Sequence, residues 1–244
     1  MPEEEFDASG VFDDAYLYFF ADRLEEHSDA DVDLIWDLLE FEPGMRVLDL
    51  ACGHGRIANR LAQRGCRVTG LDTTPVFLER ARADADARGV SVEFVHGDMR
   101  DLPWPGRFDR IVNWLSAFGF FDDSDNRKVL VQAAAALAPG GRFVIETVNY
   151  PRLVQDRVTS VVTERERDLV VDRHQLDPLT GRNHINRVVV RDGHTRRVRF
   201  FNRLVTFPEL RDWLGAAGFP AVDGYGEDGR PLTVEHRRMI AVAH

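Results

Sequence analysis

Several features that would mark whole classes of protein are scarce or missing in this sequence. It has two cysteines, Cys52 and Cys66, too few for a disulfide framework or a cysteine metal site, so we expect no bound metal. No apolar run approaches the ~18 residues of a membrane-spanning helix. The stretch Met1-Pro2-Glu3-Glu4-Glu5 is acidic, whereas a secretory signal begins with basic residues. We therefore expect a cytoplasmic protein with no membrane partner.

Basic charge is scarce as well. The 41 Asp and Glu outnumber the 31 Lys and Arg, and a net charge of −10 disfavours a nucleic-acid partner, whose phosphates require a basic surface. Lys128 is the sole lysine, and the arginines gather in residues 152–203, where twelve of them accompany seven acidic residues. Such a segment is either a solvated surface or the contact for an acidic neighbour, such as a second subunit.

The rest of the composition is that of a globular protein, with 44% hydrophobic and 30% charged residues. From residue 47 onward, segments with strand and helix patterns alternate. We predict strands at 47–50, 67–71, 91–95, 108–113 and 142–148, with helices at 57–64, 75–88 and 125–137. This order predicts an α/β fold of the Rossmann-like, doubly wound type, in which helices cover both faces of a parallel sheet.

The segments on either side of this alternation differ from it. We predict helices at 12–24 and 33–41 before it, and a helix at 206–217 with strands at 221–225 and 238–243 after it. No helix fits between the last two strands, so they should pair antiparallel. Residues 158–206 alternate Val with Arg and contain turn signals at 177–181 and 191–194, which predicts about three antiparallel strands inserted into the fold.

These patterns divide the chain into three parts. Residues 1–30 form an N-terminal helical cap, and residues 31–150 and 208–244 form the α/β core. Residues 151–207 form an antiparallel β insert after strand five. We expect the insert to cover the substrate, to mediate association, or to do both.

The most informative stretch is the glycine-rich turn that follows the first strand of the core. Gly53 and Gly55 lack a Cβ, so a ligand can lie against the backbone beside the first N–H groups of the next helix. Residues 53–58 also fit the G-x-G-x-x-A dinucleotide fingerprint, which raises a nicotinamide-dependent dehydrogenase as an alternative. Asp49, at the strand end, disfavours that alternative because it would repel a diphosphate, whereas it suits an ammonium group.

Further polar residues follow the next strands. Asp72 ends the second strand, at the place where a carboxylate would accept two ribose hydroxyls. Asp98-Met99 follows the third strand and offers an acceptor for an exocyclic amine beside an apolar side chain. Asn113-Trp114 follows the fourth. In open α/β sheets, ligands bind at these strand ends, so the residues should share one site.

Over residues 31–150 and 208–244 the sequence resembles the class I S-adenosylmethionine-dependent methyltransferases. Residues 49–55 look like the acid-rich first motif of the family, with Ala51 where many members have glycine. Asp72 matches the ribose-binding acid, and residues 97–99 look like the adenine-binding motif. Residues 139–141 and 217–219 look like the turns before strands five and six. The resemblance implies a seven-stranded sheet with the last strand antiparallel.

The resemblance also implies the cofactor, S-adenosylmethionine, and the residues that hold it. These residues are expected to be Tyr16, Asp49, Ala51, Cys52, Gly53, Gly55, Arg56, Asp72, Thr73, Phe77, Asp98, Met99, Asn113 and Trp114.

The insert and the aromatic N-terminal helix are similar to those of bacterial small-molecule methyltransferases of the natural-product type, many of which methylate amines. We therefore expect a small-molecule acceptor, methylated on an amine nitrogen, and a homo-oligomer formed through the insert. O- or C-methyl transfer, and a non-catalytic module that only binds the cofactor, are the alternatives. Aromatic faces attract cations such as a sulfonium, so Tyr18, Trp114 and Phe118 are predicted at the site of methyl transfer.

Two expectations concern residues outside this set. His174, His184 and His194, all in the insert, are expected at the surface. Phe120 is expected to pack in the core.

Overall fold

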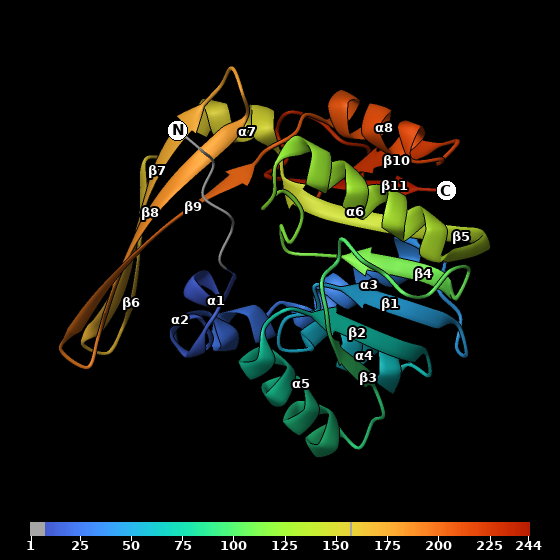
Figure 1. Ribbon diagram of the computed structural model, residues 1–244, viewed down its shortest axis with the longest axis horizontal. Coiled ribbons are helices and arrows are strands. Elements are labelled where there is room, and N and C mark those ends of the chain that lie inside the picture. Colours follow the sequence, from blue (N-terminus) through green and yellow to red (C-terminus); the bar gives the residue numbers. More distant parts are fainter. Residues whose placement is uncertain (1–7, 157) are drawn as a thin grey trace.

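A computed structural model describes residues 8–156 and 158–244 and contains two sheets (Figure 1). The larger has seven strands in the order β10-β11-β5-β4-β1-β2-β3. Its strands are β1 (Arg46–Leu50), β2 (Arg67–Asp72), β3 (Glu93–His96), β4 (Phe108–Asn113), β5 (Leu137–Val148), β10 (Val222–Tyr225) and β11 (Arg238–Ala243). β1 to β5 pair in parallel, and β11 is antiparallel to both of its neighbours, which confirms the predicted fold class.

Helices cover both faces of this sheet. The helices are α1 (Ala8–Val11), α2 (Asp14–Glu25), α3 (Ser28–Leu38), α4 (Arg56–Gln63), α5 (Pro75–Arg88), α6 (Asp123–Ala136), α7 (Tyr150–Asp156) and α8 (Phe207–Ala216). Among the residues described, no helix has the length and apolar character needed to cross a membrane.

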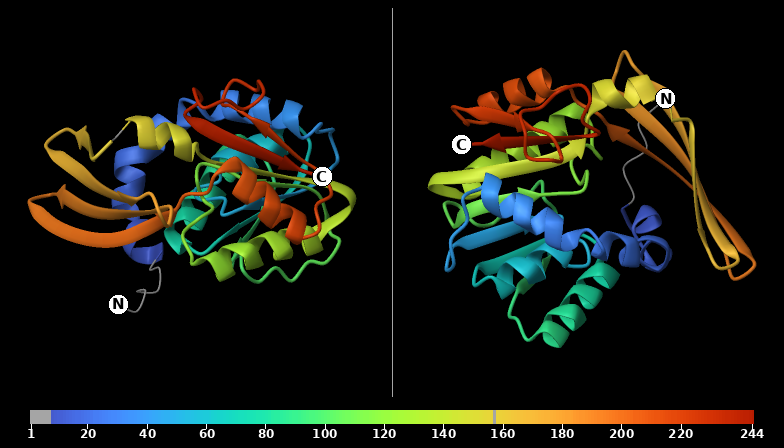
Figure 2. Two further views of the ribbon diagram at one scale, coloured as in Figure 1. Left: turned by 90° about the horizontal axis from the view of Figure 1, so that it is seen from above. Right: turned by 180° about the vertical axis from the view of Figure 1, so that it is seen from behind.

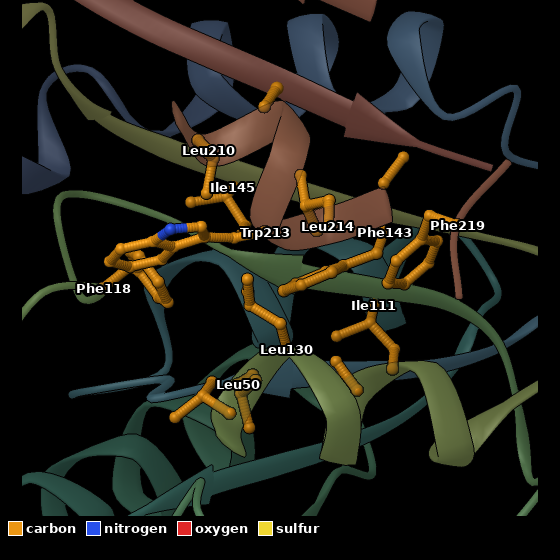
Figure 3. Packing of buried hydrophobic residues seen from close by; sticks show 14 of the residues in the cluster. Leu50, Ile111, Phe118, Leu130, Phe143, Ile145, Leu210, Trp213, Leu214 and Phe219 are labelled. Atoms are coloured by element: carbon orange, nitrogen blue, oxygen red, sulfur yellow. The ribbon is translucent and has the colours of Figure 1, made fainter. Parts of the chain in front are cut away.

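The central parallel strands β1, β2 and β4 are buried on both sides, and their alternate residues contribute to two separate hydrophobic clusters. Val47 packs with α3 and α4 on one face. Leu48 and Leu50 point to the other face, where α6 and α8 contribute Leu130 and Trp213 (Figure 3). The sheet is thereby held rigidly at its centre, and the loops at its strand ends are left to build a site.

The insert forms the second sheet and stands apart from the core. Its strands are β6 (Ser160–Arg165), β7 (Asp168–Asp177), β8 (Arg182–Arg191) and β9 (His194–Arg203), each antiparallel to the next. Val170 and Val189, on its inner face, pack against Phe19 of α2. The N-terminal helices α1 and α2 therefore lie between the insert and the core (Figures 1 and 2).

Most predicted elements are present, but their bounds differ in places: α3 begins at Ser28 and not at 33, and the short helix α1 precedes the predicted N-terminal helix. The insert has four strands where about three were expected, although both predicted turns join strands as expected. β5 begins at Leu137, not at 142, because Leu137 already has extended backbone angles and pairs with Phe108. Helix α7 was missed: it is short, and Pro151 in its first turn obscured it in the sequence.

Candidate functional site

A cavity of about 690 Å³ opens at the carboxyl ends of the core strands. Small-molecule sites commonly span ~300–1,000 Å³. Three parts of the chain form its wall: α1 and α2, the loops after β1 to β4, and the inner face of the insert. Among the described residues, no group of three His, Cys, Asp or Glu side chains is arranged to hold a metal ion.

The glycine turn after β1 forms one side of the cavity. Gly55 has a φ of +79°, and a Cβ there would lie 2.8 Å from the Cβ of Ala81, so glycine lets α4 begin close against α5. Ala51 also adopts a left-handed conformation, with φ +63°. That conformation costs an alanine ~1–2 kcal/mol, which explains why glycine is the common residue at this place.

Two buried side chains of opposite charge line the cavity, and each has one polar atom without a hydrogen-bond partner among the described residues. Asp49 is 2% exposed, and its Oδ2 accepts no hydrogen bond from the part of the chain that the structure describes. Burial raises the pKa of Asp49 to about 7, although the positive charge of Arg56 opposes the shift. The Nη1 of Arg56 donates to Asp31, whereas its Nη2 is buried and has no partner in residues 8–156 and 158–244. A ligand with an ammonium and a carboxylate group would satisfy both side chains.

Asp72 ties the end of β2 to the glycine turn. Its Oδ2 accepts from the Gly53 N–H at 2.8 Å, and its Oδ1 accepts from the Thr74 N–H at 2.8 Å. Burial raises the pKa of Asp72, and these backbone hydrogen bonds oppose the shift. Each carboxylate oxygen has a second lone pair, so Asp72 can still accept from ligand hydroxyls.

Asp98, after β3, is held by an arginine. Its Oδ1 accepts from the backbone N–H of Arg100 at 2.8 Å, and its Oδ2 accepts from the Nη2 of Arg100 at 2.7 Å. Burial alone would raise the pKa of Asp98, but the hydrogen bonds and charge of Arg100 outweigh it and lower that pKa. Asp98 is therefore a fixed, ionised acceptor beside the apolar side chain of Met99.

The loop after β4 is held in an uncommon shape at the cavity. Leu115 and Ser116 both have left-handed backbone angles, with φ of +60° and +55°. The buried carboxylate of Glu146 accepts from the Leu115 N–H at 2.6 Å and forms an ion pair with Arg238. Arg238 in turn donates to the Ser116 hydroxyl at 3.0 Å. This network offsets the cost of the strained turn and orients Trp114, which lines the cavity.

The insert contributes a polar wall. Asp172 and Arg187 face each other across β7 and β8 and form a bidentate ion pair, with both nitrogen–oxygen distances 2.8 Å. His174 and Phe200 complete this side of the cavity.

Comparison with known proteins matches this arrangement to a family. A family model described as a methyltransferase domain matches residues 47–141. A demethylmenaquinone methyltransferase from Thermus thermophilus is 41% identical over 121 residues, which are 46% of this chain and 54% of that protein. The chain thus spans about half the length of this relative.

A longer match extends over the insert. A cypemycin N-terminal methyltransferase from Streptomyces is 30% identical over 210 residues, or 82% of each chain. This chain belongs to the class I S-adenosylmethionine-dependent methyltransferases. The solved structure of the CcbJ methyltransferase from Streptomyces caelestis superposes with a TM-score of 0.78 over 98% of this chain and 99% of that one, at 20% identity, which shows a shared fold.

S-adenosylmethionine is the cofactor of this methyltransferase family, and the unpaired atoms of Asp49 and Arg56 fit its amino-acid end. Most residues predicted to hold it line the cavity: Tyr16, Asp49, Ala51, Cys52, Gly53, Arg56, Asp72, Thr73, Phe77, Asp98, Met99 and Trp114. Gly55 and Asn113 lie behind this lining. Gly55 packs against α5, and Asn113 donates from Nδ2 to the Leu50 carbonyl at 2.9 Å.

The structure does not bring Tyr18 and Phe118 to the cavity with Trp114. The ring of Tyr18 lies against the insert, with the guanidinium of Arg165 4.6 Å from its centre. Phe118 packs in the hydrophobic cluster that also contains Trp213 (Figure 3). The left-handed turn at 115–116 directs Phe118 away from the cavity. Tyr18 lies on the side of α2 that contacts Arg165 of the insert.

Other cavity residues were not identified from the sequence. His174, expected at the surface, and Phe120, expected in the core, both line the cavity. The signal for His174 was the alternation along β7, which places it on the same face as Asp172. Arg187 and Arg238 had no local signal, because each reaches the site through strand pairing over a long sequence distance.

Proposed function

We propose that this protein transfers a methyl group from S-adenosylmethionine to an amine nitrogen of a small molecule. The observation that carries the proposal is the pair of buried, unpaired atoms at the cavity wall, Asp49 Oδ2 and Arg56 Nη2. Leaving such groups unsatisfied costs ~1–3 kcal/mol each, so their presence points to a zwitterionic ligand.

Four side chains would hold the cofactor. Asp49 would accept from its ammonium group and Arg56 would donate to its carboxylate, while Asp72 would accept from the ribose hydroxyls. Asp98 would accept from the adenine amine. When bound, S-adenosylmethionine supplies a methyl group on a positively charged sulfur, which needs no further activation.

The acceptor side of the cavity favours nitrogen over oxygen as the methylated atom. A hydroxyl usually needs a base to remove its proton, whereas a neutral amine carries its own lone pair. Asp172 is engaged by Arg187, and Asp98 by Arg100. Burial lowers the pKa of His54 to about 4, which makes it a weak base. The chain therefore positions and desolvates the acceptor, and does not deprotonate it.

We further propose that residues 1–30 and 151–207 cover the cavity, exclude water and select the acceptor. Support comes from the described part of both segments: Phe12 and Tyr16 on one side, and His174, Arg187 and Phe200 on the other, line the cavity. The edge strand β6, with Val161 and Val162 exposed, is our proposed contact for a homo-oligomer.

The nature of the acceptor is supported by two further observations. One relative, which covers 82% of this chain, is named an N-terminal methyltransferase, and an N-terminus is an amine. The net charge of −10 disfavours a nucleic-acid acceptor, whose phosphates require a basic surface.

The test is incubation with S-adenosylmethionine carrying a ¹³C-labelled methyl group and a panel of amines, matched alcohols, phenols and an rRNA fragment. We expect the ¹³C signal of an N-methyl product. An O- or C-methyl product would overturn the choice of nitrogen. Tight cofactor binding with no product from any member of the panel would instead favour the non-catalytic module.

A further inference from the structure

We infer that the insert binds an uncharged oxygen of the acceptor, through hydrogen bonds donated by His174 and Arg187. This inference rests on the proposed function and narrows the acceptor to an amine that also carries a hydroxyl or carbonyl group. The inference concerns the choice of acceptor and not the chemical step, because neither residue transfers a proton.

The contacts of His174 make it a donor toward the cavity. Its Nδ1 lies 3.1 Å from the Nδ2 of Asn183, which is an amide nitrogen and can only donate. Nδ1 must therefore accept, and the neutral ring carries its proton on Nε2. Nε2 makes no hydrogen bond to the residues that the structure describes, and His174 lines the cavity.

The groups that face His174 keep the ring neutral. Burial lowers the pKa of His174 from its ordinary value of 6.5, and the charge of Arg187 works in the same direction. The carboxylate of Asp172 opposes the shift without reversing it. The ring is therefore neutral at neutral pH. Its hydrogen bond to the buried Asn183 fixes its orientation, so that Nε2 remains a donor toward the cavity.

Arg187 presents a second donor on the same face. Its Nε and Nη2 both point to Asp172, and its Nη1 makes no hydrogen bond to the described residues. The side chain is 11% exposed, and its guanidinium lies 5.2 Å from the centre of the Phe200 ring and 5.7 Å from that of Phe20. The salt bridge and the two rings hold the guanidinium in place. In the strand register Asp172 is opposite Arg187 and His174 is opposite Ile185, so the two donors are diagonal neighbours.

The charge balance of this pair selects the kind of oxygen. Asp172, 15% exposed, cancels the charge of Arg187 and would repel a ligand carboxylate or phosphate. An uncharged hydroxyl or carbonyl oxygen can accept from Nε2 of His174 and from Nη1 of Arg187 with no such repulsion. The wall therefore favours a polar, uncharged substituent on the acceptor over an anionic one.

The first test observes the ring directly and needs no turnover. In ¹⁵N-resolved NMR of the full chain, we expect His174 to be neutral with its proton on Nε2 from about pH 6.5 upward. A proton on Nδ1, or a ring that is charged at neutral pH, would overturn the inference. The signal is assigned by its loss in His174→Phe.

The second test measures binding to the protein saturated with S-adenosylhomocysteine, in which no methyl group is available. The probes are cyclohexylamine, its three aminocyclohexanol isomers with the hydroxyl at carbon 2, 3 or 4, and 4-aminocyclohexanecarboxylate. We expect at least one hydroxylated amine to bind about tenfold more tightly than cyclohexylamine, as two hydrogen bonds of ordinary net strength would give. The carboxylate should gain nothing.

Two variants of His174 distinguish the effect of the lost hydrogen-bond donor from the effect of a changed pocket shape. His174→Phe should abolish the preference for the hydroxyl, whereas His174→Gln, which keeps an N–H near the position of Nε2, should retain most of it. His184→Phe is the matched control: His184 lies on β8, on the opposite, exposed face of the insert, and its loss should change nothing.

Equal binding of the three hydroxylated amines and cyclohexylamine, or no binding of any, would overturn the inference, as would an unchanged preference in His174→Phe. These readouts are independent of methyl transfer. If the NMR and binding results contradict the inference while N-methyl products form, the specificity assignment is wrong and the proposed function stands. If those results agree with the inference and no methylated product forms, the proposed function is wrong and the binding assignment stands.

Discussion

Replacement of Asp49 by asparagine should stabilise the protein and weaken its cofactor binding at the same time. The carboxyl has a pKa of about 7 in the folded chain, against an ordinary value of 3.8, because it is buried without a partner for Oδ2 among the described residues. Between these pH values the folded state binds more protons than the unfolded state. The free energy of unfolding must therefore fall as the pH rises from about 4 to 7.

The size of the effect follows from the shift. Each pKa unit corresponds to about 1.4 kcal/mol, so the ionised Asp49 destabilises the ligand-free protein by as much as about 4 kcal/mol at pH 8. The asparagine side chain cannot ionise, so the substitution removes that cost. Urea unfolding at pH 5 and pH 8 should show that the difference in free energy of unfolding between the variant and the native protein becomes more favourable to the variant at the higher pH. Asp86→Asn, at an exposed position on α5, is the control and should show no such gain.

Cofactor binding should move the other way. An ammonium group beside Asp49 favours the carboxylate, so binding of S-adenosylhomocysteine should release protons and strengthen as the pH approaches 7. Calorimetry in buffers of different ionisation enthalpy measures this release. In Asp49→Asn the release should vanish, with affinity lower by about 1.5–3 kcal/mol, the range for a hydrogen bond to a charged group. An asparagine variant that is no more stable at pH 8, or an affinity of the native protein that is independent of pH, would refute the reasoning.

Three further substitutions test the site and its frame. Asp72→Ala should weaken S-adenosylhomocysteine binding by about 1.5–3 kcal/mol in calorimetry and lower the Tm, because Asp72 also fixes two backbone N–H groups; normal affinity would show that it does not hold the ribose. Gly55→Ala should destabilise the chain by at least about 1–2 kcal/mol in denaturant unfolding, since the alanine would be left-handed and too close to Ala81; an unchanged midpoint would contradict the tight turn. Thr206→Ala should cost about 1 kcal/mol of stability through the lost helix cap and leave cofactor affinity unchanged, and a change in affinity would contradict this separation.

The core could be predicted from the sequence because its signals are local. In the core, a buried parallel strand is followed within a few residues by a glycine turn and then by a helix. Each of these elements limits which structure the next segment can adopt. The bounds of β4 and α5 were predicted correctly for this reason. The acidic strand ends then meet at one edge as a consequence of the parallel sheet.

The acceptor side could not be predicted in the same way, because its residues meet through pairing between distant segments. Alternation along β7 shows that His174 and Asp172 share a face, but not that this face is turned to the cavity. That direction is set by the packing of Val170 on Phe19, which no local pattern reveals. Phe118 was misplaced for a similar reason, since aromatic residues in a loop have no periodicity to orient them.

The most direct test of the site is a crystal structure of the protein bound to S-adenosylhomocysteine. We expect its amino group within hydrogen-bond distance of Asp49 Oδ2, its carboxylate on Arg56 Nη2 and its ribose hydroxyls on Asp72. An amino-acid end that lies elsewhere, with Asp49 Oδ2 and Arg56 Nη2 still without partners, would contradict the assignment on which the proposed function depends.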